Sequence, residues 1–109
     1  MFDPHAAYND AEQLMNAEQL EEAHAALANI VEQEDSFVLA HLALARVCTK
    51  LGRHLDAVQH AQRACELEPQ DAFNFTTLSV TCQRAWAGTQ DQKFIQMAED
   101  AMAKAQSMR

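Results

Sequence analysis

The chain has 109 residues, with 16 acidic and 8 basic side chains and a formal net charge of −8. Its length suits one domain with a modest hydrophobic core. The acidic excess lies in residues 1–45, which contain nine Asp or Glu and no Lys or Arg. Because this half repels phosphate, the composition argues against general nucleic-acid binding. With 2 Gly, 2 Pro and no sustained apolar–polar alternation, the sequence predicts an all-α protein.

The three cysteines are odd in number and form no C-x-x-C pair, which favours free thiols in a reducing compartment. The first residues lack the basic and apolar regions of a signal peptide. No apolar run approaches the ~18 to 20 residues that span a membrane. We therefore expect a cytoplasmic protein that does not insert into a membrane.

The first two helices are expected over residues 4–16 and from residue 20 to the polar stretch 32–35. Asp3 is a good N-cap, and Pro4 loses nothing at the first helical position, where no amide donor is needed. The second helix carries apolar residues at spacings of three and four, which predicts one buried face. These residues are Leu20, Ala23, Leu27 and Ile30.

A helical hairpin is predicted over residues 35–71. Asp35 or Ser36 can cap its first helix, and Gly52 supplies the left-handed residue that closes it. Pro69 prevents the second helix of the pair from continuing. The inward face of the first helix is expected to be Leu44, Val47, Cys48 and Leu51. The second helix carries Leu55, Ala57, Val58, Ala61, Ala64, Cys65 and Leu67.

Two further helices are predicted after residue 71. Asp71 can cap the fifth helix and Gly88 is expected to end it, while Thr89 to Gln92 matches a T-x-x-Q capping box for the sixth. The sixth helix should run nearly to Arg109. The fifth helix carries the apolar residues Phe75, Leu78, Val80, Cys82 and Trp86, and the sixth carries Phe94, Ile95, Met97, Ala98, Ala101, Met102 and Ala105.

The sequence repeats along its length, and the shift that places Ala23 on Ala57 also places Leu44 on Leu78 and Cys48 on Cys82. With its turn glycine and terminal proline, the segment 38–71 resembles a tetratricopeptide repeat. Residues 4–37 are similar but depart from the pattern at Asp10, Glu18 and Asp35. Residues 72–109 fit after an insertion of about seven residues, which predicts that both helices of the third hairpin are about one turn longer.

This resemblance implies a right-handed α-solenoid of three helix-turn-helix hairpins, with six helices and an elongated third hairpin. The whole chain, 1–109, would form one domain with repeats at about 4–37, 38–71 and 72–109. Proteins of this family are typically non-catalytic adaptors or scaffolds that bind a peptide or helix of another protein. A chaperone-like secretion or assembly factor, a detached regulatory domain and an enzyme built on the scaffold are the alternatives.

In the family, the first helices of the hairpins line a concave groove. Arg46 and Lys50 are four residues apart on one helical face, and Arg84 follows Arg46 by one repeat plus one turn. A carboxylate could bind there through charge-assisted hydrogen bonds. Alternatively, these cations are solvated and only balance helix C-terminal dipoles. The groove positions mapped from the family are Tyr8, Glu12, Met15, Asn16, Leu39, Leu42, Ala43, Arg46, Thr49, Lys50, Phe73, Thr76, Thr77, Val80, Gln83 and Arg84.

One subtype of the family clamps the C-terminal tails of heat-shock chaperones with Lys, Asn and Arg side chains. The corresponding positions here are Tyr8, Glu12, Ala43, Phe73 and Thr77. The clamp residues are absent, so binding of those tails is not implied.

The sixth helix is expected to leave an apolar edge uncovered, through which the chain could form a homodimer. The edge residues are Phe94, Ile95, Met97 and Met102.

No pattern in the sequence predicts catalysis, a metal or a cofactor. Cys48 and Cys82 share one repeat position, which favours packing over nucleophilic chemistry. The histidines show no metal-site spacing, and we expect surface or turn positions for all of them. They are His5, His24, His41, His54 and His60.

Overall fold

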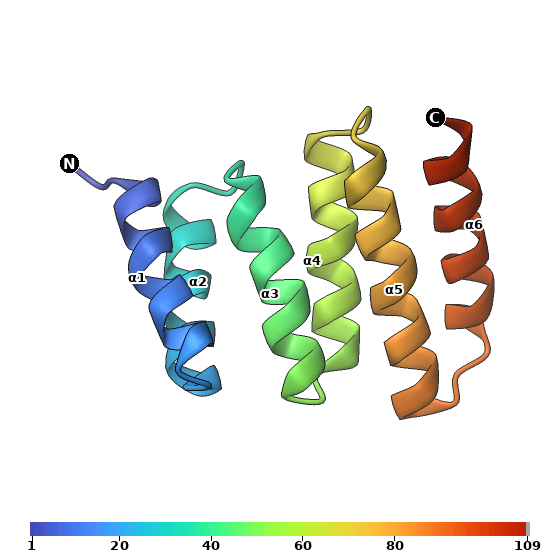
Figure 1. Cartoon of the computed structure of the whole chain (residues 1–109), viewed down its shortest axis with the longest axis horizontal. Helices are drawn as coiled ribbons and strands as arrows, with labels where there is room; N and C mark the ends of the chain where they lie inside the picture. The colour runs from blue at the N-terminus through green and yellow to red at the C-terminus, as the bar shows by residue number, and fades with distance from the viewer. Residues whose placement is uncertain (109) are drawn as a thin grey trace.

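The computed structural model describes residues 1–108, which form six α-helices in a row of three antiparallel hairpins (Figure 1). The odd-numbered helices lie on one side of the row, with α2 and α4 behind them, so that each hairpin contacts the next along the chain. The helices are α1 (Pro4–Asn16), α2 (Leu20–Gln33), α3 (Val38–Lys50), α4 (His54–Leu67), α5 (Ala72–Thr89) and α6 (Lys93–Ser107).

The sequence repeat is confirmed in the helix starts. The first helices of the three hairpins begin at Pro4, Val38 and Ala72, so equal lengths of chain separate one start from the next. The all-α architecture and the arrangement in three hairpins are therefore as predicted.

Three helix ends follow the local capping chemistry that the sequence predicts. Asp3 accepts hydrogen bonds from the amides of His5 (3.1 Å) and Ala6 (3.3 Å), and Asp71 accepts one from the amide of Phe73 (2.9 Å). Gly52 adopts a φ of +79°, the left-handed conformation that closes α3. Short-range caps thus set these boundaries.

The predicted cap of α3 is wrong. The N-cap residue is Phe37, and no side chain caps the helix there. The carboxylate of Asp35 instead pairs with the guanidinium of Arg63 on α4. The side chain of Asp35 is thus engaged in an ion pair with a residue far along the chain, and it does not cap α3.

The third hairpin is elongated, but its two helices do not share the extra length as predicted. α5 has 18 residues, against 13 in α1 and α3, whereas α6 has 15 against 14 in α4. The extra residues lie almost entirely in α5, so this helix extends beyond the other two first helices.

The predicted end of α5 and the predicted capping box are both wrong. α5 continues through Gly88 to Thr89, and Gln90 adopts the left-handed conformation at its end, with φ 62°. The hydroxyl of Thr89 accepts from the amide of Asp91 (3.1 Å), and the carboxylate of Asp91 accepts from the amide of Lys93 (3.1 Å). Asp91 therefore provides the capping oxygen at the start of α6.

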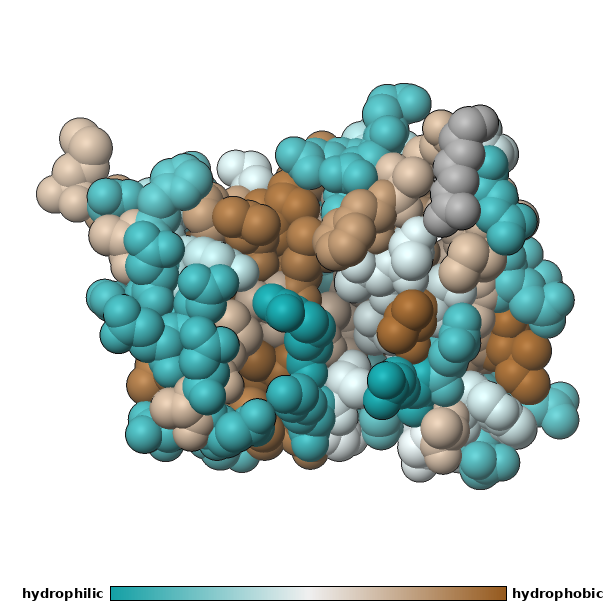
Figure 2. All heavy atoms as spheres, in the orientation of Figure 1, coloured by the Kyte–Doolittle hydropathy of each residue, from teal (hydrophilic) through white to brown (hydrophobic). Residues whose placement is uncertain are grey.

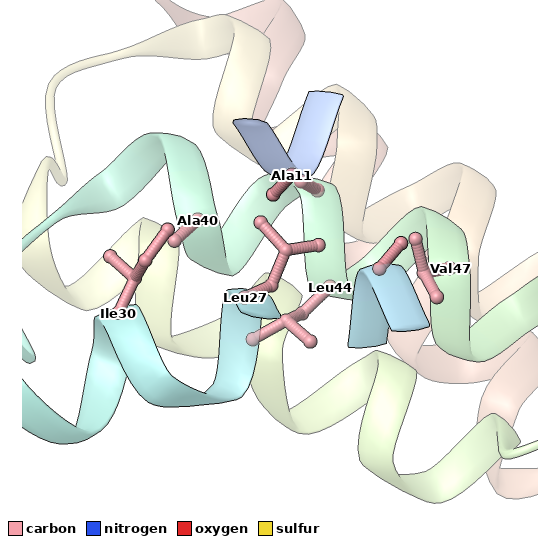
Figure 3. Packing of buried hydrophobic residues seen from close by; sticks show 8 residues of the cluster. Ala11, Leu27, Ile30, Ala40, Leu44 and Val47 are labelled. Atoms are coloured by element: carbon pink, nitrogen blue, oxygen red, sulfur yellow. The ribbon is translucent and has the colours of Figure 1, made fainter. Parts of the chain in front are cut away.

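The core combines small residues with a few branched ones (Figure 3). Leu27 and Ile30 of α2 point toward Ala40 and Leu44 of α3, and Ala11 closes the cluster from α1. Alanine at the contacts lets helix backbones approach closely. The repeating pattern of small residues is thus the basis of the stacking.

The buried face of α5 is more polar than predicted. Leu78 and Trp86 are half-buried and Val80 is exposed, whereas Asn74 and Ser79 are buried. Ser79 donates to the carbonyl of Ala98 on α6 (2.8 Å). Asn74 donates to the carbonyl of Ala64 on α4 (3.2 Å). These bonds tie α5 to both neighbouring helices.

Candidate partner-binding groove

A hollow of about 410 Å³ lies between α3 and α5. It brings together Arg46 and Lys50 of α3 with every α5 residue of the predicted groove except Gln83. The lining residues are Ala45, Arg46, Thr49, Lys50, Phe73, Thr76, Thr77, Val80, Thr81 and Arg84.

A second hollow of about 270 Å³ lies between α1 and α3 and shares Arg46 and Lys50 with the first. The two hollows therefore lie on either side of the Arg46 and Lys50 side chains, along the first helices of the three hairpins. We refer to the two hollows together as the groove. Figure 2 shows this face, with hydrophobic side chains gathered over and beside α3 and hydrophilic ones around them. The second hollow is lined by Glu12, Met15, Asn16, Glu18, Leu20, Arg46, Val47 and Lys50.

Several predicted groove residues lie outside these hollows. Leu39 is exposed, Leu42 is half-buried, and the ring of Tyr8 lies 6.0 Å from that of Phe37 near the N-terminal end of α3. Ala43 is fully buried and packs in the core with α2, so its place in the predicted groove is wrong.

The groove contains arginines without a carboxylate partner, which is unusual in so acidic a chain. Within residues 1–108, neither Arg46 nor Arg84 has an acidic group within ion-pair distance. By contrast, Arg53 lies 2.8 Å from Glu21, and Arg63 pairs with Asp35 and Glu66. The hollow between α3 and α5 is thus a local excess of positive charge.

Apolar groups surround these arginines. Phe73 and Val80 are 63% and 43% exposed. The threonines contribute little polarity, because Thr49 and Thr81 donate their hydroxyls to carbonyls of their own helices (2.8 and 2.7 Å). The surface therefore suits a ligand that combines apolar groups with negative charge.

No protein-family model and no curated protein matches the sequence. Among solved structures, a tetratricopeptide repeat domain protein from Salinibacter ruber aligns over 98% of this chain and 100% of its own, with TM-score 0.60 and 20% identity. The MamA RS-1 ArsTM double mutant aligns over 97% of this chain and 75% of its own, with TM-score 0.64 and 14% identity. The chain has the tetratricopeptide-repeat fold.

In this tetratricopeptide-repeat fold the apolar edge expected on α6 is only partly present. Phe94 is 3% exposed and packs against Val58 and Cys82, so its place on the edge is wrong. Ile95 is 39% exposed, and Met97 and Met102 are half-buried. The largest residue of the predicted edge is therefore part of the core.

The sequence did not predict the pairing of His41 with His60. His41 is buried, not on the surface, and its Nδ1 lies 3.1 Å from Nδ1 of His60 on α4. The two residues are 19 positions apart, so neither helix shows the pairing by itself. Within the part of the chain that the structure describes, no group of three or more His, Cys, Asp or Glu is arranged to hold a metal ion.

The three thiols are buried and free. Burial, the largest cause at each position, raises the pKa of Cys48, Cys65 and Cys82 to about 11. A thiol with such a pKa is a weak nucleophile at neutral pH. Across residues 1–108, no helix combines the length and apolar character that a membrane span needs.

Proposed function

We propose that the chain is a non-catalytic adaptor that holds a peptide or helix of another protein in the groove along α1, α3 and α5. Acidic side chains of that partner bind Arg46 and Arg84, and its apolar side chains cover Phe73 and Val80. The observation that carries the proposal is the pair of unpaired arginines in one hollow with an exposed aromatic ring.

The chemistry of these side chains supports this use. A guanidinium can bind a carboxylate through two parallel hydrogen bonds, which gives orientation as well as affinity. Arginine and aromatic residues also dominate the binding free energy of many protein interfaces. In the free protein both arginines are exposed to water, so leaving them unpaired costs little folding free energy.

The remaining features of the groove support binding more than catalysis. Its lining contains no histidine or cysteine. The carboxylates of the adjoining hollow, Glu12 and Glu18, are exposed to water. A general acid or base is usually held in a drier cleft that shifts its pKa.

The test is affinity capture from the lysate of the source organism with wild-type protein and three variants. Arg46→Glu and Arg84→Glu each reverse a charge in the groove. Lys104→Glu is the control, because it reverses the charge of an exposed side chain on α6, outside the groove. We expect the specific partner to be retained by the Lys104 variant and lost by the other two. For the purified partner, each arginine reversal should weaken binding more than tenfold, as about 1.5–3 kcal/mol is typical of such bonds.

Circular dichroism must show that the variants keep their helices. If the double variant Arg46→Glu/Arg84→Glu is folded and binds the partner as tightly as wild type, the groove is not the binding surface.

A further inference from the structure

A third hollow, of about 390 Å³, lies between α5 and α6 and shares no lining residue with the groove. Its polar groups are largely bonded to one another: Ser79 donates to the carbonyl of Ala98, and Gln83 donates to the hydroxyl of Ser79 (3.3 Å). Apart from the Glu99 carboxylate, its exposed surface is mostly apolar. The lining residues are Ser79, Gln83, Trp86, Ile95, Ala98, Glu99 and Met102.

The repeat shows what such a surface does elsewhere in this chain. Ala45 and Thr49 of α3 face α5 across the groove, and they lie one repeat before Ser79 and Gln83. One repeat earlier again, Met15 of α1 faces α3. In the first two hairpins, the corresponding surface is thus adjacent to the first helix of the next hairpin.

The second helices show the same relation. Ile30 of α2 packs with Ala40 and Leu44 of α3, and Val58 of α4 packs with Cys82 of α5. The hollow between α5 and α6 is therefore the third copy of an interface that receives a helix in the first two hairpins. Within residues 1–108, no helix follows α6 to cover it.

The helix that fills the first copy shows the required stripe. α3 buries residues at spacings of i, i+3, i+4 and i+7, all small or branched and apolar. These are Ala40, Ala43, Leu44 and Val47.

Charge selects among the helices that could bind. Glu99 is the one ionisable group that lines the hollow, it is exposed, and it has no ion pair among the described side chains. A helix with a Lys or Arg beside its apolar stripe would supply the missing partner.

A second copy of this chain does not meet that requirement. The α1 residues one repeat before the α3 stripe are all exposed, and none is basic. Docking α1 would bring Asp10 into the place of Leu44, which is buried and apolar in α3. The α1 helix also contains no Lys or Arg that could pair with Glu99. The α1 residues are Ala6, Asn9, Asp10 and Gln13.

We propose that the hollow between α5 and α6 binds a cationic amphipathic helix of a partner protein, which extends the stack as α3 and α5 do within the chain. This surface is separate from the groove, so either could fail without the other. The adaptor would then hold two partners of opposite charge, one in the groove and one at the end of the stack.

The test uses the intact protein, labelled with ¹⁵N, and two synthetic helical peptides. Both peptides carry Ala, Ala, Leu and Val at i, i+3, i+4 and i+7, and they differ only in having Lys or Glu beside the stripe. We expect the Lys peptide to bind saturably and to shift the amide signals of Ser79, Gln83, Glu99 and Met102. The variant Glu99→Lys should reverse the preference between peptides, by about fivefold for each.

Two further variants locate the site. Ile95→Ser should weaken binding of the Lys peptide, and Arg46→Glu should leave it unchanged. The proposal is overturned if neither peptide binds, if both bind equally, or if the shifts map to the groove. A dimer in light scattering that Ile95→Ser dissociates would also overturn it, because a second copy would then occupy the hollow.

Discussion

The imidazole of His54 occupies the space that a β-carbon on Gly88 would fill. Such a carbon would lie 2.1 Å from Nε2 of the ring. His54 is the first residue of α4, and Gly88 is in the last turn of α5. The contact fixes the start of one helix against the end of the next, and it explains a glycine inside a helix, where glycine costs about 1 kcal/mol relative to alanine.

We predict that Gly88→Ala gains none of the about 1 kcal/mol that the helix propensity of alanine would add, because the new methyl group displaces the imidazole of His54. Urea denaturation measures the change. In a His54→Ala background the same substitution should instead stabilise the protein, since only the higher helix propensity of alanine remains. An equal gain in stability in both backgrounds would contradict the contact.

The geometry of the His41–His60 pair assigns its hydrogen atoms. Nε2 of His41 lies 2.7 Å from the carbonyl oxygen of Asp35, which can only accept, so Nε2 carries hydrogen. In the neutral ring Nδ1 of His41 is then bare, and Nδ1 of His60 donates to it across 3.1 Å. If both rings were protonated, two N–H groups would point at each other.

We predict that acid weakens the protein through this pair. Burial is the largest cause that lowers the pKa of His60 below its ordinary 6.5, and the nearby His41 and His24 lower it further. The carboxylate of Asp56 raises this pKa but does not outweigh them. The unfolded chain therefore binds this proton more readily than the folded one. The contribution to stability is present above about pH 6.5 and is lost as pH falls from there through the pKa of folded His60.

Urea midpoints at about pH 7.5 and about pH 5.5 measure this loss. His60→Gln serves as the control, because its amide can still donate to His41 but does not titrate. The variant should show a smaller difference between the two midpoints. An equal difference would mean that other groups cause the acid sensitivity.

A larger residue at Ala57 should disrupt the stacking of helices. Ala57 is fully buried on α4 at a position where α2 has Ala23. We predict that Ala57→Leu costs about 1–3 kcal/mol of unfolding free energy because the packed backbones must separate. Ala103→Leu, on the exposed side of α6, is the matched control and should change stability by less than about 0.5 kcal/mol.

Phe73 should matter for binding and not for folding. Its ring is 63% exposed in the hollow between α3 and α5. We predict that Phe73→Ala changes the free energy of unfolding by less than about 0.5 kcal/mol and weakens a groove partner by about 2 kcal/mol or more. Calorimetric titration with the captured partner measures the affinity. Equal losses of stability and affinity would point to a structural role.

The thiols should react only when the protein opens. With pKa values of about 11, Cys48, Cys65 and Cys82 hold on the order of one thiolate per thousand thiols at about pH 8. We predict that DTNB labels all three slowly in native buffer and rapidly in urea. Fast labelling of one thiol in the folded protein would show that its region opens on its own.

Sequence predicted the features that depend on neighbouring residues. The caps at Asp3 and Asp71 and the turn at Gly52 each need only two or three residues, and all three are confirmed. The positions of Arg46 and Arg84 on one hollow also followed from the repeat.

What the sequence did not predict depends on contacts between separate helices. Asp35 is 28 residues from Arg63, so no local pattern indicated that its carboxylate would pair with Arg63 and not cap α3. Gly88 looked like a helix end because its partner His54 belongs to another helix. The burial of Ser79 is compensated by its hydrogen bond to a carbonyl of α6, which no pattern within α5 shows.

The middle hairpin is contacted by α1 and α2 on one side and by α5 on the other. Within residues 1–108, each end hairpin is contacted by its neighbour on one side only. In a stack whose stability comes from contacts between neighbours, the ends open more often than the centre. The backbone amides of α3 and α4 should therefore exchange hydrogen most slowly, and a helix bound beside α6 would slow exchange in the third hairpin as well.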